Sequence, residues 1–531
     1  MSKIQKGMVL IVSTTETNEL HRTLDWKDAF WVASGVPALV LFSIGGIAVT
    51  IGAPSWAVWT LSICMGFLQS FTYAEIAGLF PNKAGGVSVY GAIAWVRYSK
   101  FVAPLSAFSS WFAWSPVLSI GTGLASGYIL TALFPADSVI RTWQITLVSL
   151  DFIKDGLNLR INSTFILGAI ILLSIYSIQS KGIAKAAKLQ MIMALTALLP
   201  LVLIGIVPLF TGDVLSSNFA PFAPISGAWD KGGWTLFFGG MFIAAWSTYG
   251  FETAVCYTSE FKNPKTDTFK AIFYSGLLCL FMFTVVPLAF QGFLGVEGMT
   301  APGISDGSGV ANVMASMVGG GPIVANIIVV MLILALSLTI MTSMAGNSRT
   351  LYQSSVDGMF PKYLSHVNKN GAPIRAMKTD VCFNLLLLLM SNYLFVLAAS
   401  NVGYIIFNFL NLNAGWIHRI DNGHINRPWK APSWLIATNT VLAFVNLTFL
   451  GAGANVWGKG TLLTGIIFIS AIVPIFYYRH YIVDKGKFPD SMMDALQLED
   501  GTPVEKKAGY LPYVALAAGV LIVFVTNRIF S

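Results

Sequence analysis

The chain has 531 residues, of which 55% are hydrophobic and 11% are charged, and its formal net charge is +8. Soluble domains carry about 25% charged residues, so this composition excludes a soluble globular protein and indicates one whose surface faces lipid. The positive charge does not indicate a nucleic-acid partner, because no basic stripe is interleaved with aromatic residues and the Lys and Arg residues sit in short loops.

Hydrophobic runs long enough to cross a membrane recur along the whole chain. A hydrocarbon core of about 30 Å requires about 20 apolar residues in a helix. We predict transmembrane helices near 28–51, 55–80, 101–133, 163–181, 189–210, 234–258, 271–294, 322–347, 380–399, 401–419, 433–453 and 461–479. Residues 510–530 form a thirteenth apolar run, which either spans the membrane or lies in its interface.

The distribution of basic residues predicts how the chain is oriented. Of the 32 Lys and Arg residues, 26 fall in the N-terminal tail and in alternate loops, and six fall on the opposite side. Cytoplasmic loops are enriched in Lys and Arg, so residues 1–27 are predicted to be the cytoplasmic tail of a multi-pass plasma (inner) membrane protein. Residues 480–509 are polar and charged, and we predict that they form a mobile cytoplasmic tail.

Glu252 is the clearest ionisable residue inside a predicted span. Ionisable side chains in a membrane interior are costly and point to function. The eight residues 245–252 also include Ser247, Tyr249 and Gly250, and serine and glycine weaken a continuous helix. The segment is therefore either a locally unwound stretch whose free backbone groups face a ligand, or a polar helix face on which Glu252 bonds to a neighbouring helix.

The first predicted span is also interrupted. Pro37 follows Gly35 and Val36 in an apolar run, and proline removes a helix donor and clashes with the preceding turn. We therefore predict a kink at this point. Two interrupted helices in corresponding halves of a chain are the best sequence indication of a transporter site.

Five further polar or aromatic residues inside predicted spans each allow two interpretations. Thr342 and Ser343 either help to bind an ion or bond to a backbone carbonyl four residues back. Trp111 and Trp114 either gate a cavity or serve as packing residues. Tyr404 either lines a cavity together with neighbouring asparagines or holds helices together.

The sequence contains no motif of an enzyme or a nucleotide site. It has no H-E-x-x-H, Walker A or G-x-S-x-G pattern and no cluster of histidines. The four cysteines lie in apolar runs without C-x-x-C spacing, so we interpret them as small hydrophobic residues. We predict no catalytic activity, no metal and no cofactor.

Several segments resemble the amino acid–polyamine–organocation superfamily of permeases. In chain order they read YAEIA at 73–77, FP at 80–81, AGGV at 84–87, WSTYGFETA at 246–254, EFKNPK at 260–265, SRTLY at 348–352, DGMFP at 357–361, GAP at 371–373 and RPWKAP at 427–432. The segments occur in the same order as in the family over most of the chain. This shared order supports the resemblance more strongly than any single motif does.

The resemblance implies a LeuT-type fold. Spans 1–5 and 6–10 would form an inverted repeat over residues 28–420, followed by two further helices within 433–479. Broken helices one and six would then hold a substrate near the membrane midplane. The candidate residues are Gly35, Val36, Pro37, Ala38, Trp246, Ser247, Tyr249 and Glu252 for the substrate, Glu252, Thr342 and Ser343 for coupling or an ion, and Trp111, Trp114 and Tyr404 for gates.

Span one departs from the family pattern. The family carries G-x-x-x-G-S-G there, and its bare backbone binds the carboxylate of an amino acid. This chain reads GVPALVLF at 35–42, so it retains Gly35 and lacks the downstream glycines. Either Pro37 unwinds the helix by another route, or the substrate is not a standard α-amino acid. A lysine that some members carry in span five is also absent, because the middle of that span reads TAL at 196–198.

We predict secondary active transport of an amino acid or related amine by alternating access, as ion-coupled symport. One alternative is an antiporter that trades an amino acid for an amine. A second alternative, from another class, is a non-transporting sensor or scaffold on a permease fold. The expected partners are a small-molecule substrate and membrane lipid. The sequence does not predict the oligomeric state.

Overall fold

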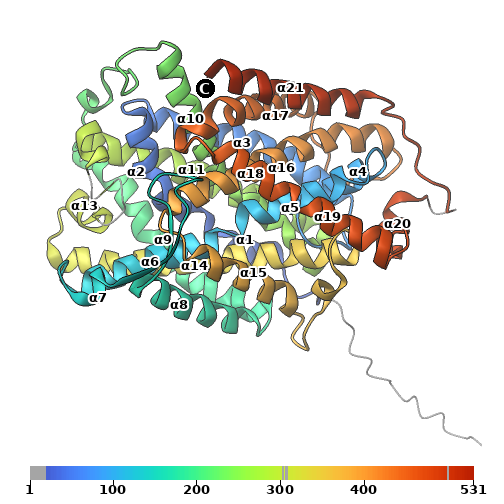
Figure 1. Cartoon of the computed structure of the whole chain (residues 1–531), viewed down its shortest axis with the longest axis horizontal. Helices are drawn as coiled ribbons and strands as arrows, with labels where there is room; N and C mark the ends of the chain where they lie inside the picture. Colours follow the sequence, from blue (N-terminus) through green and yellow to red (C-terminus); the bar gives the residue numbers. More distant parts are fainter. Residues whose placement is uncertain (1–19, 302–303, 305–308, 499–500, 531) are drawn as a thin grey trace, which may run out of the picture.

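The computed structural model describes residues 20–301, 304, 309–498 and 501–530 (Figure 1). Secondary structure in this part of the chain is almost entirely helical, which confirms the predicted all-α fold. Within the described residues, nine helical stretches are long and apolar enough to cross a membrane: Trp26–Ile51, Val102–Leu133, Ile183–Thr211, Pro264–Thr300, Pro322–Val356, Tyr393–Asp421, Ser433–Trp457, Thr461–Val483 and Leu511–Phe530. The chain is therefore a multi-pass membrane protein.

The N-terminal half begins with a broken helix and contains the two strands. Its elements are α1 (Trp26–Ala33), η1 (Val36–Leu39), α2 (Val40–Ile51), α3 (Ser55–Gly78), α4 (Val87–Val96), α5 (Val102–Trp114), α6 (Val117–Leu133), α7 (Val139–Thr142), β1 (Gln144–Ser149), β2 (Asn158–Asn162), α8 (Ser163–Gln179), α9 (Ile183–Thr211) and η2 (Ser216–Phe219). Strands β1 and β2 pair antiparallel in a hairpin.

The C-terminal half also begins with a broken helix. Its elements are α10 (Lys231–Thr248), η3 (Gly250–Glu260), α11 (Pro264–Thr300), α13 (Val310–Met317), α14 (Pro322–Val356), η4 (Lys362–Ser365), α15 (Ile374–Leu387), α16 (Tyr393–Asp421), α17 (Ser433–Gly453), η5 (Ala454–Trp457), α18 (Thr461–Ser470), α19 (Ile472–Tyr477), η6 (Tyr478–Val483), α20 (Asp490–Leu496) and α21 (Leu511–Phe530). The inverted repeat stays a prediction, but both halves contain the broken helix that it requires.

Three predicted spans are interrupted near their middle. In span one, the short 3₁₀ helix η1 separates α1 from α2 around Pro37, so the predicted kink is confirmed. In span six, α10 ends at Thr248 and the chain continues as the 3₁₀ helix η3. In span three, α5 and α6 meet at Ser115 and Pro116, a break that the hydropathy pattern did not reveal. A proline accounts for the first and third breaks because it lacks a backbone N–H.

The predicted boundary between spans nine and ten is wrong. The sequence placed these spans at 380–399 and 401–419, whereas α15 ends at Leu387 and α16 runs unbroken from Tyr393. The polar residue that ends the connection is Asn392, whose side chain caps α16 by accepting from the N–H of Phe395 at 2.9 Å. Asn401 does not break α16, because its side chain donates sideways to the carbonyl of Phe242.

The segment after η6 is not the mobile tail that its charge predicted. Helix α20 packs against the loop before α4, where Lys83 donates to the carbonyl of Ser491 at 2.7 Å. Lys83 also forms a buried ion pair with Asp357 at 2.5 Å, and the Ser491 hydroxyl donates to the same carboxylate at 2.6 Å. Buried partners of opposite charge therefore hold the described part of this segment in place.

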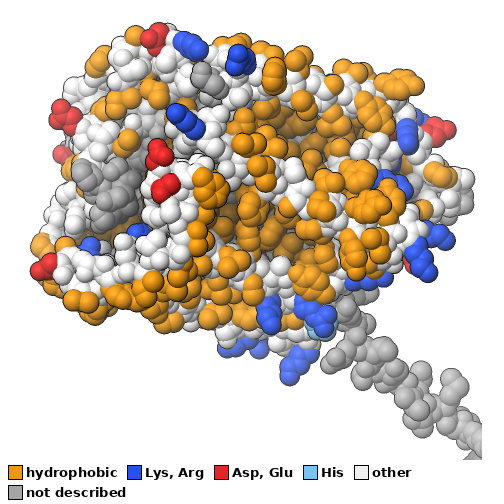
Figure 2. Space-filling view, viewed as in Figure 1, with side chains coloured by type: hydrophobic (Ala, Val, Ile, Leu, Met, Phe, Trp, Pro, Cys, Tyr) orange, Lys and Arg blue, Asp and Glu red, His pale blue; other side chains and the backbone are white. Residues whose placement is uncertain are grey.

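The surface of the molecule suits a lipid environment. Figure 2 shows hydrophobic side chains over much of one face, with Lys and Arg side chains toward its right and lower edges. Large apolar side chains such as Phe524 and Ile323 are 69% and 77% exposed. Apolar patches of this extent mark a surface that contacts lipid or another protein. Helix α21 has the length to span a bilayer, and whether it spans or lies in the interface stays a prediction.

Candidate functional site

A buried carboxyl group lies at the centre of the predicted residues. Glu252, in the first turn of η3, is 4% exposed. Its Oε1 accepts a hydrogen bond from Trp114 Nε1 at 3.2 Å, and its Oε2 accepts one from the Tyr404 hydroxyl at 2.8 Å. Helices α5 and α16 thus each supply one donor to a carboxyl group on the broken sixth span. The segment leaves the regular α-helix as a 3₁₀ helix, and Glu252 bonds to neighbouring helices as the second interpretation has it; that free backbone groups of the segment face a ligand stays a prediction.

Aromatic rings surround this carboxyl group. The ring of Trp114 lies 5.6 Å from that of Trp246 and 5.1 Å from that of Tyr404, and Tyr249 lies 6.0 Å from Tyr404. Trp246 is anchored by its Nε1, which donates to the Ala113 carbonyl at 2.8 Å. Glu252 and four aromatic residues, each of which the sequence analysis named as a candidate, therefore form one cluster. We call them the Glu252 cluster: Trp114, Trp246, Tyr249, Glu252 and Tyr404.

Ser247 lies beside this cluster and joins the two broken helices. Its hydroxyl shares a hydrogen bond of 2.7 Å with the hydroxyl of Ser43, on α2. Both side chains are buried. The predicted role of Ser247 in substrate binding stays a prediction, and its observed contact holds α10 against α2.

Hydroxyl groups of α14 donate to backbone carbonyls at the breaks in spans one and three. Thr342 donates to the Val32 carbonyl at 2.5 Å, and Thr339 donates to the Gly35 carbonyl at 2.8 Å. Ser343 donates to the Trp114 carbonyl at 2.7 Å. Every polar backbone group inside a membrane needs a partner. The expectation that Thr342 and Ser343 bond four residues back is therefore wrong: they bond to other helices, and their role with an ion stays a prediction.

A small cavity lies where the two broken helices meet α5, α6 and α14. Its volume is about 10 Å³, which is room for roughly one water molecule. The residues that line it are Val36, Leu39, Trp114, Val117, Gly250, Thr253, Thr339, Thr342 and Ser343. An amino acid does not fit in this space.

The predicted residues of span one surround the break in different ways. Val36 lines the cavity. Gly35 lies against α14, where an added Cβ would come within 2.5 Å of the Thr342 hydroxyl oxygen. Pro37 and Ala38 are buried within η1. Gly35 thus allows the close approach on which the bonds from Thr339 and Thr342 depend.

Gly250 permits a similar approach, and its substitution is expected to destabilise the cluster. A Cβ at this position would lie 2.8 Å from Trp114 Cη2 and 3.1 Å from Val36 Cγ1. Gly250→Ala should therefore lower the stability of the purified protein by about 1–3 kcal/mol, as overpacking does, and thermal unfolding measures this change. Gly127→Ala is the control, because a Cβ there meets nothing within 4 Å. Equal unfolding temperatures for both variants would contradict the packing argument.

Trp111 belongs to a second polar site that the sequence did not reveal. Its Nε1 donates to Asp380 Oδ1 at 3.0 Å, and the Ser115 hydroxyl donates to the same oxygen. Asp380 lies in the middle of α15, and its side chain is fully buried. The wrong boundary placed Asp380 at the end of a span, where an acidic residue is unremarkable. Correct bounds for α15 would have identified it.

The described residues include no metal site of the usual kind. No group of three or more His, Cys, Asp or Glu side chains in this part of the chain is placed to hold a metal ion. The geometry is that of a buried carboxyl group among aromatic rings at a broken membrane helix, beside a small cavity that Trp114 also lines. This is the chemistry expected of a site for a small polar or cationic solute.

Comparison with known families agrees with this geometry. The family model described as amino acid permease matches residues 24–472, which is most of the chain. The chain belongs to the amino acid permease family. This family lies within the amino acid–polyamine–organocation superfamily, so the predicted resemblance is confirmed. Its members are transporters and not enzymes.

The permease is similar to several named transporters, at low identity. It is 24% identical to the branched-chain amino acid permease BcaP of Bacillus subtilis, over 64% of this chain and 63% of that protein. It is 24% identical to the chloroplastic cationic amino acid transporter 9 of Arabidopsis thaliana, over 67% of this chain and 59% of that protein. It is 21% identical to BcaP of Lactococcus lactis, over 84% of this chain and 93% of that protein. The permease thus spans about three fifths of the length of the first two relatives.

Proposed function

We propose that this permease carries an amino acid or a related amine across the plasma membrane by alternating access, as an ion-coupled symporter. The observation that carries the proposal is the meeting of two broken helices at a small cavity beside the Glu252 cluster. Broken helices in a membrane expose backbone groups and helix ends that recognise charged groups of a substrate. Relatives named as branched-chain and cationic amino acid transporters support the substrate class.

The chemistry of the cluster favours a substrate with an amino group. Glu252 is an acceptor for a cationic amine, and the faces of Trp114, Trp246 and Tyr404 attract a cation by cation–π interaction. The cavity must enlarge before a substrate enters, because it holds about one water molecule as it stands. Separation of the broken helices from α14 would provide that space, and this separation is the motion that alternating access requires.

A buried ion pair supports a gate at one end of this pathway. Arg349 of α14 donates from Nε to Glu260 Oε2 at 2.9 Å and from its NH2 group to Oε1 at 2.8 Å. Glu260 ends η3, and its carbonyl accepts the N–H groups of Thr23 and Leu24. The N-terminal segment, the sixth span and the eighth span are thus fastened together at this end. We propose that this contact closes the cytoplasmic side and opens during transport.

Transport by the purified protein in proteoliposomes tests the proposal. We expect a branched-chain, neutral or cationic amino acid, or an amine, to accumulate when an ion gradient is imposed. Counterflow of labelled substrate without an ion gradient, combined with no net accumulation when the gradient is present, would support an antiporter instead. Ligand binding that raises thermal stability without any flux would contradict transport and support a sensor.

A further inference from the structure

Asp380 carries a fully buried carboxyl group, and only one of its two oxygens has a hydrogen-bond partner among the described residues. Trp111 Nε1 and the Ser115 hydroxyl both donate to Oδ1. The other oxygen, Oδ2, is buried and has no hydrogen-bond partner among the described residues. An acceptor left without a partner in a buried site costs about 1–3 kcal/mol, and more when the group is charged. The hydrogen bonds formed by the described residues therefore satisfy only one of the two carboxyl oxygens.

No Lys, Arg or His side chain among the described residues pairs with this carboxyl group. The ion pairs formed within the described part of the chain do not include Asp380. An ionised carboxylate that is buried without a partner of opposite charge is costly, so the group requires a proton or a bound cation.

The described helices packed around α15 place no charged side chain against the Asp380 carboxyl group. Helix α14 presents the amide of Asn347 to Asp380, while its Arg349 is engaged with Glu260. From η4, the Tyr363 hydroxyl bonds to Thr379, and Lys362 pairs with Asp484. The groups that face the carboxyl group are thus an indole, a hydroxyl and amides, all of them neutral.

The donors around Asp380 favour a proton over a metal cation. An indole N–H only donates, so Trp111 cannot ligate a cation and instead stabilises negative charge on Oδ1. Hard cations take six or more oxygen ligands, and this site offers one free carboxyl oxygen. A proton needs only that one oxygen. The single carboxyl oxygen that the site offers is enough to bind a proton and not enough to bind a hard metal cation.

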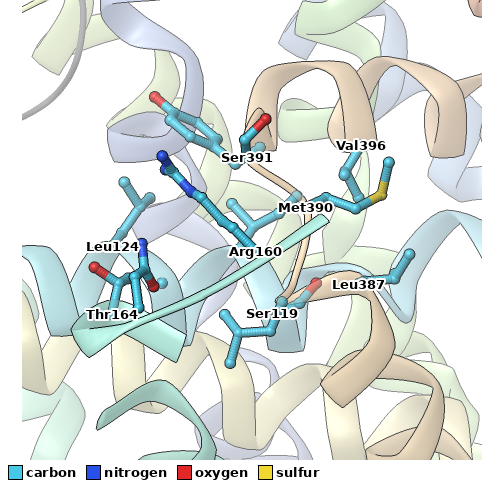
Figure 3. A pocket seen from close by; sticks show the side chains of 13 residues that line it. Ser119, Leu124, Arg160, Thr164, Leu387, Met390, Ser391 and Val396 are labelled. Atoms are coloured by element: carbon cyan, nitrogen blue, oxygen red, sulfur yellow. The ribbon is translucent and has the colours of Figure 1, made fainter. Parts of the chain in front are cut away.

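A polar path joins Asp380 to a pocket beside β2. The Asn384 side chain donates to the Ser115 hydroxyl at 2.8 Å and accepts from the N–H of Ser119 at 3.1 Å. Ser119 also lines a pocket of about 130 Å³ between α6, α15 and β2, which is room for several water molecules. Figure 3 shows Arg160 and Ser391 among the other residues that line it. Water can therefore come within two polar residues of the Asp380 contacts.

We propose that Asp380 binds a single proton on Oδ2 and exchanges it directly with water that enters from this pocket, while Asn384 and Ser115 position the carboxyl group and do not relay the proton. Only the further statement that this proton is the coupling ion of transport rests on the proposed function. The structural link between Asp380 and the substrate site is short. Trp111 donates a hydrogen bond to Asp380, and Trp114, three residues later on α5, donates one to Glu252. Residues three apart lie on one helix face, so a change at either carboxyl group acts on the same turn of α5.

Infrared spectroscopy of the purified protein tests proton binding without any substrate, with the proton itself as the probe. The stretch of a protonated carboxyl group should lose intensity in Asp380→Asn relative to the wild-type protein, and any part of the band that remains and is lost in Glu252→Gln belongs to Glu252, which is also buried and outside the ion pairs of the described residues. Asp380→Glu should keep a shifted band, which shows that the site survives. Asp137→Asn is the control, because Asp137 is exposed, and it should leave the band unchanged. An identical spectrum for Asp380→Asn and wild type at every pH would overturn the proposal.

The exchange route is tested by filling the pocket. A Cβ on Gly123 would meet only Leu388 Cδ1, at 3.6 Å, so Gly123→Leu places its side chain in the pocket with little strain on the fold. Exchange of the Asp380 proton for deuterium, seen as a shift of the carboxyl band, should be slower in this variant. An unchanged exchange rate would overturn the proposed route.

Transport measurements separate this inference from the carrier function. In proteoliposomes, Asp380→Asn should lose accumulation driven by a pH gradient and retain counterflow, if the proton is the coupling ion. Accumulation that persists in Asp380→Asn would overturn the coupling role, even if the band is lost. An Asp380 band in a protein without flux would support proton binding and contradict only the carrier function.

Discussion

Glu252→Gln is expected to reduce substrate uptake by about 10- to 100-fold while the protein still folds. A hydrogen bond to a charged group contributes about 1.5–3 kcal/mol, and each 1.4 kcal/mol corresponds to a factor of ten. Glutamine retains the size of the side chain and one acceptor for Trp114 or Tyr404, so the packing of the cluster should persist. Only the charge that would attract an amine is lost. Initial rates of uptake in proteoliposomes, compared at equal protein content, measure the effect.

The exposed carboxyl group of Glu297 provides the matched control for this substitution. Glu297→Gln removes one charge from the end of α11 without disturbing a buried contact, and uptake should remain at the wild-type level. Thermal unfolding of both variants separates a defect in transport from a defect in folding. Wild-type uptake by Glu252→Gln across the pH range would remove this residue from the mechanism. It would then leave Glu252 as a contact that holds η3 against α5 and α16.

Arg349→Met should destabilise the protein by about 3–5 kcal/mol, because it leaves the buried Glu260 carboxylate without a partner. The guanidinium group makes three contacts with that carboxylate, and it lies 5.5 Å from the ring of Tyr257. Both members of the pair are almost completely buried. Thermal unfolding of the purified protein measures the loss, and the unfolding temperature should fall clearly.

The double variant Arg349→Met with Glu260→Met distinguishes an unpaired charge from lost packing. Replacement of both partners by apolar groups is often nearly neutral, so the double variant should recover most of the stability. Lys507→Met serves as the control, since the pair of Lys507 with Glu505 is exposed and such pairs contribute about 1 kcal/mol or less. If the double variant is as unstable as Arg349→Met, packing and not charge accounts for the loss.

The sequence alone determined the class of the protein and the chemistry of its centre. A composition with 11% charged residues requires a lipid environment, and apolar runs of about 20 residues locate most helices because length and hydropathy are local properties. Pro37 and Gly250 indicated the two broken helices for a similar reason: each acts on its own turn of the backbone. Glu252 was identified because a charge inside an apolar run is visible without a structure.

Contacts between distant segments were decided only by the tertiary structure. Trp114, Tyr404 and Glu252 are far apart in the sequence, and their shared hydrogen bonds depend on how α5, α16 and η3 pack. Asp380 was missed because hydropathy averages over a window and cannot place the break at Asn392, where a single side chain caps α16. The segment after η6 was expected to be mobile because its own sequence is polar and charged. The sequence does not show that Ser491 of this segment bonds to Lys83 and Asp357, which lie far away along the chain. Local chemistry thus predicts elements, whereas partners for buried polar groups exist only once the helices are assembled.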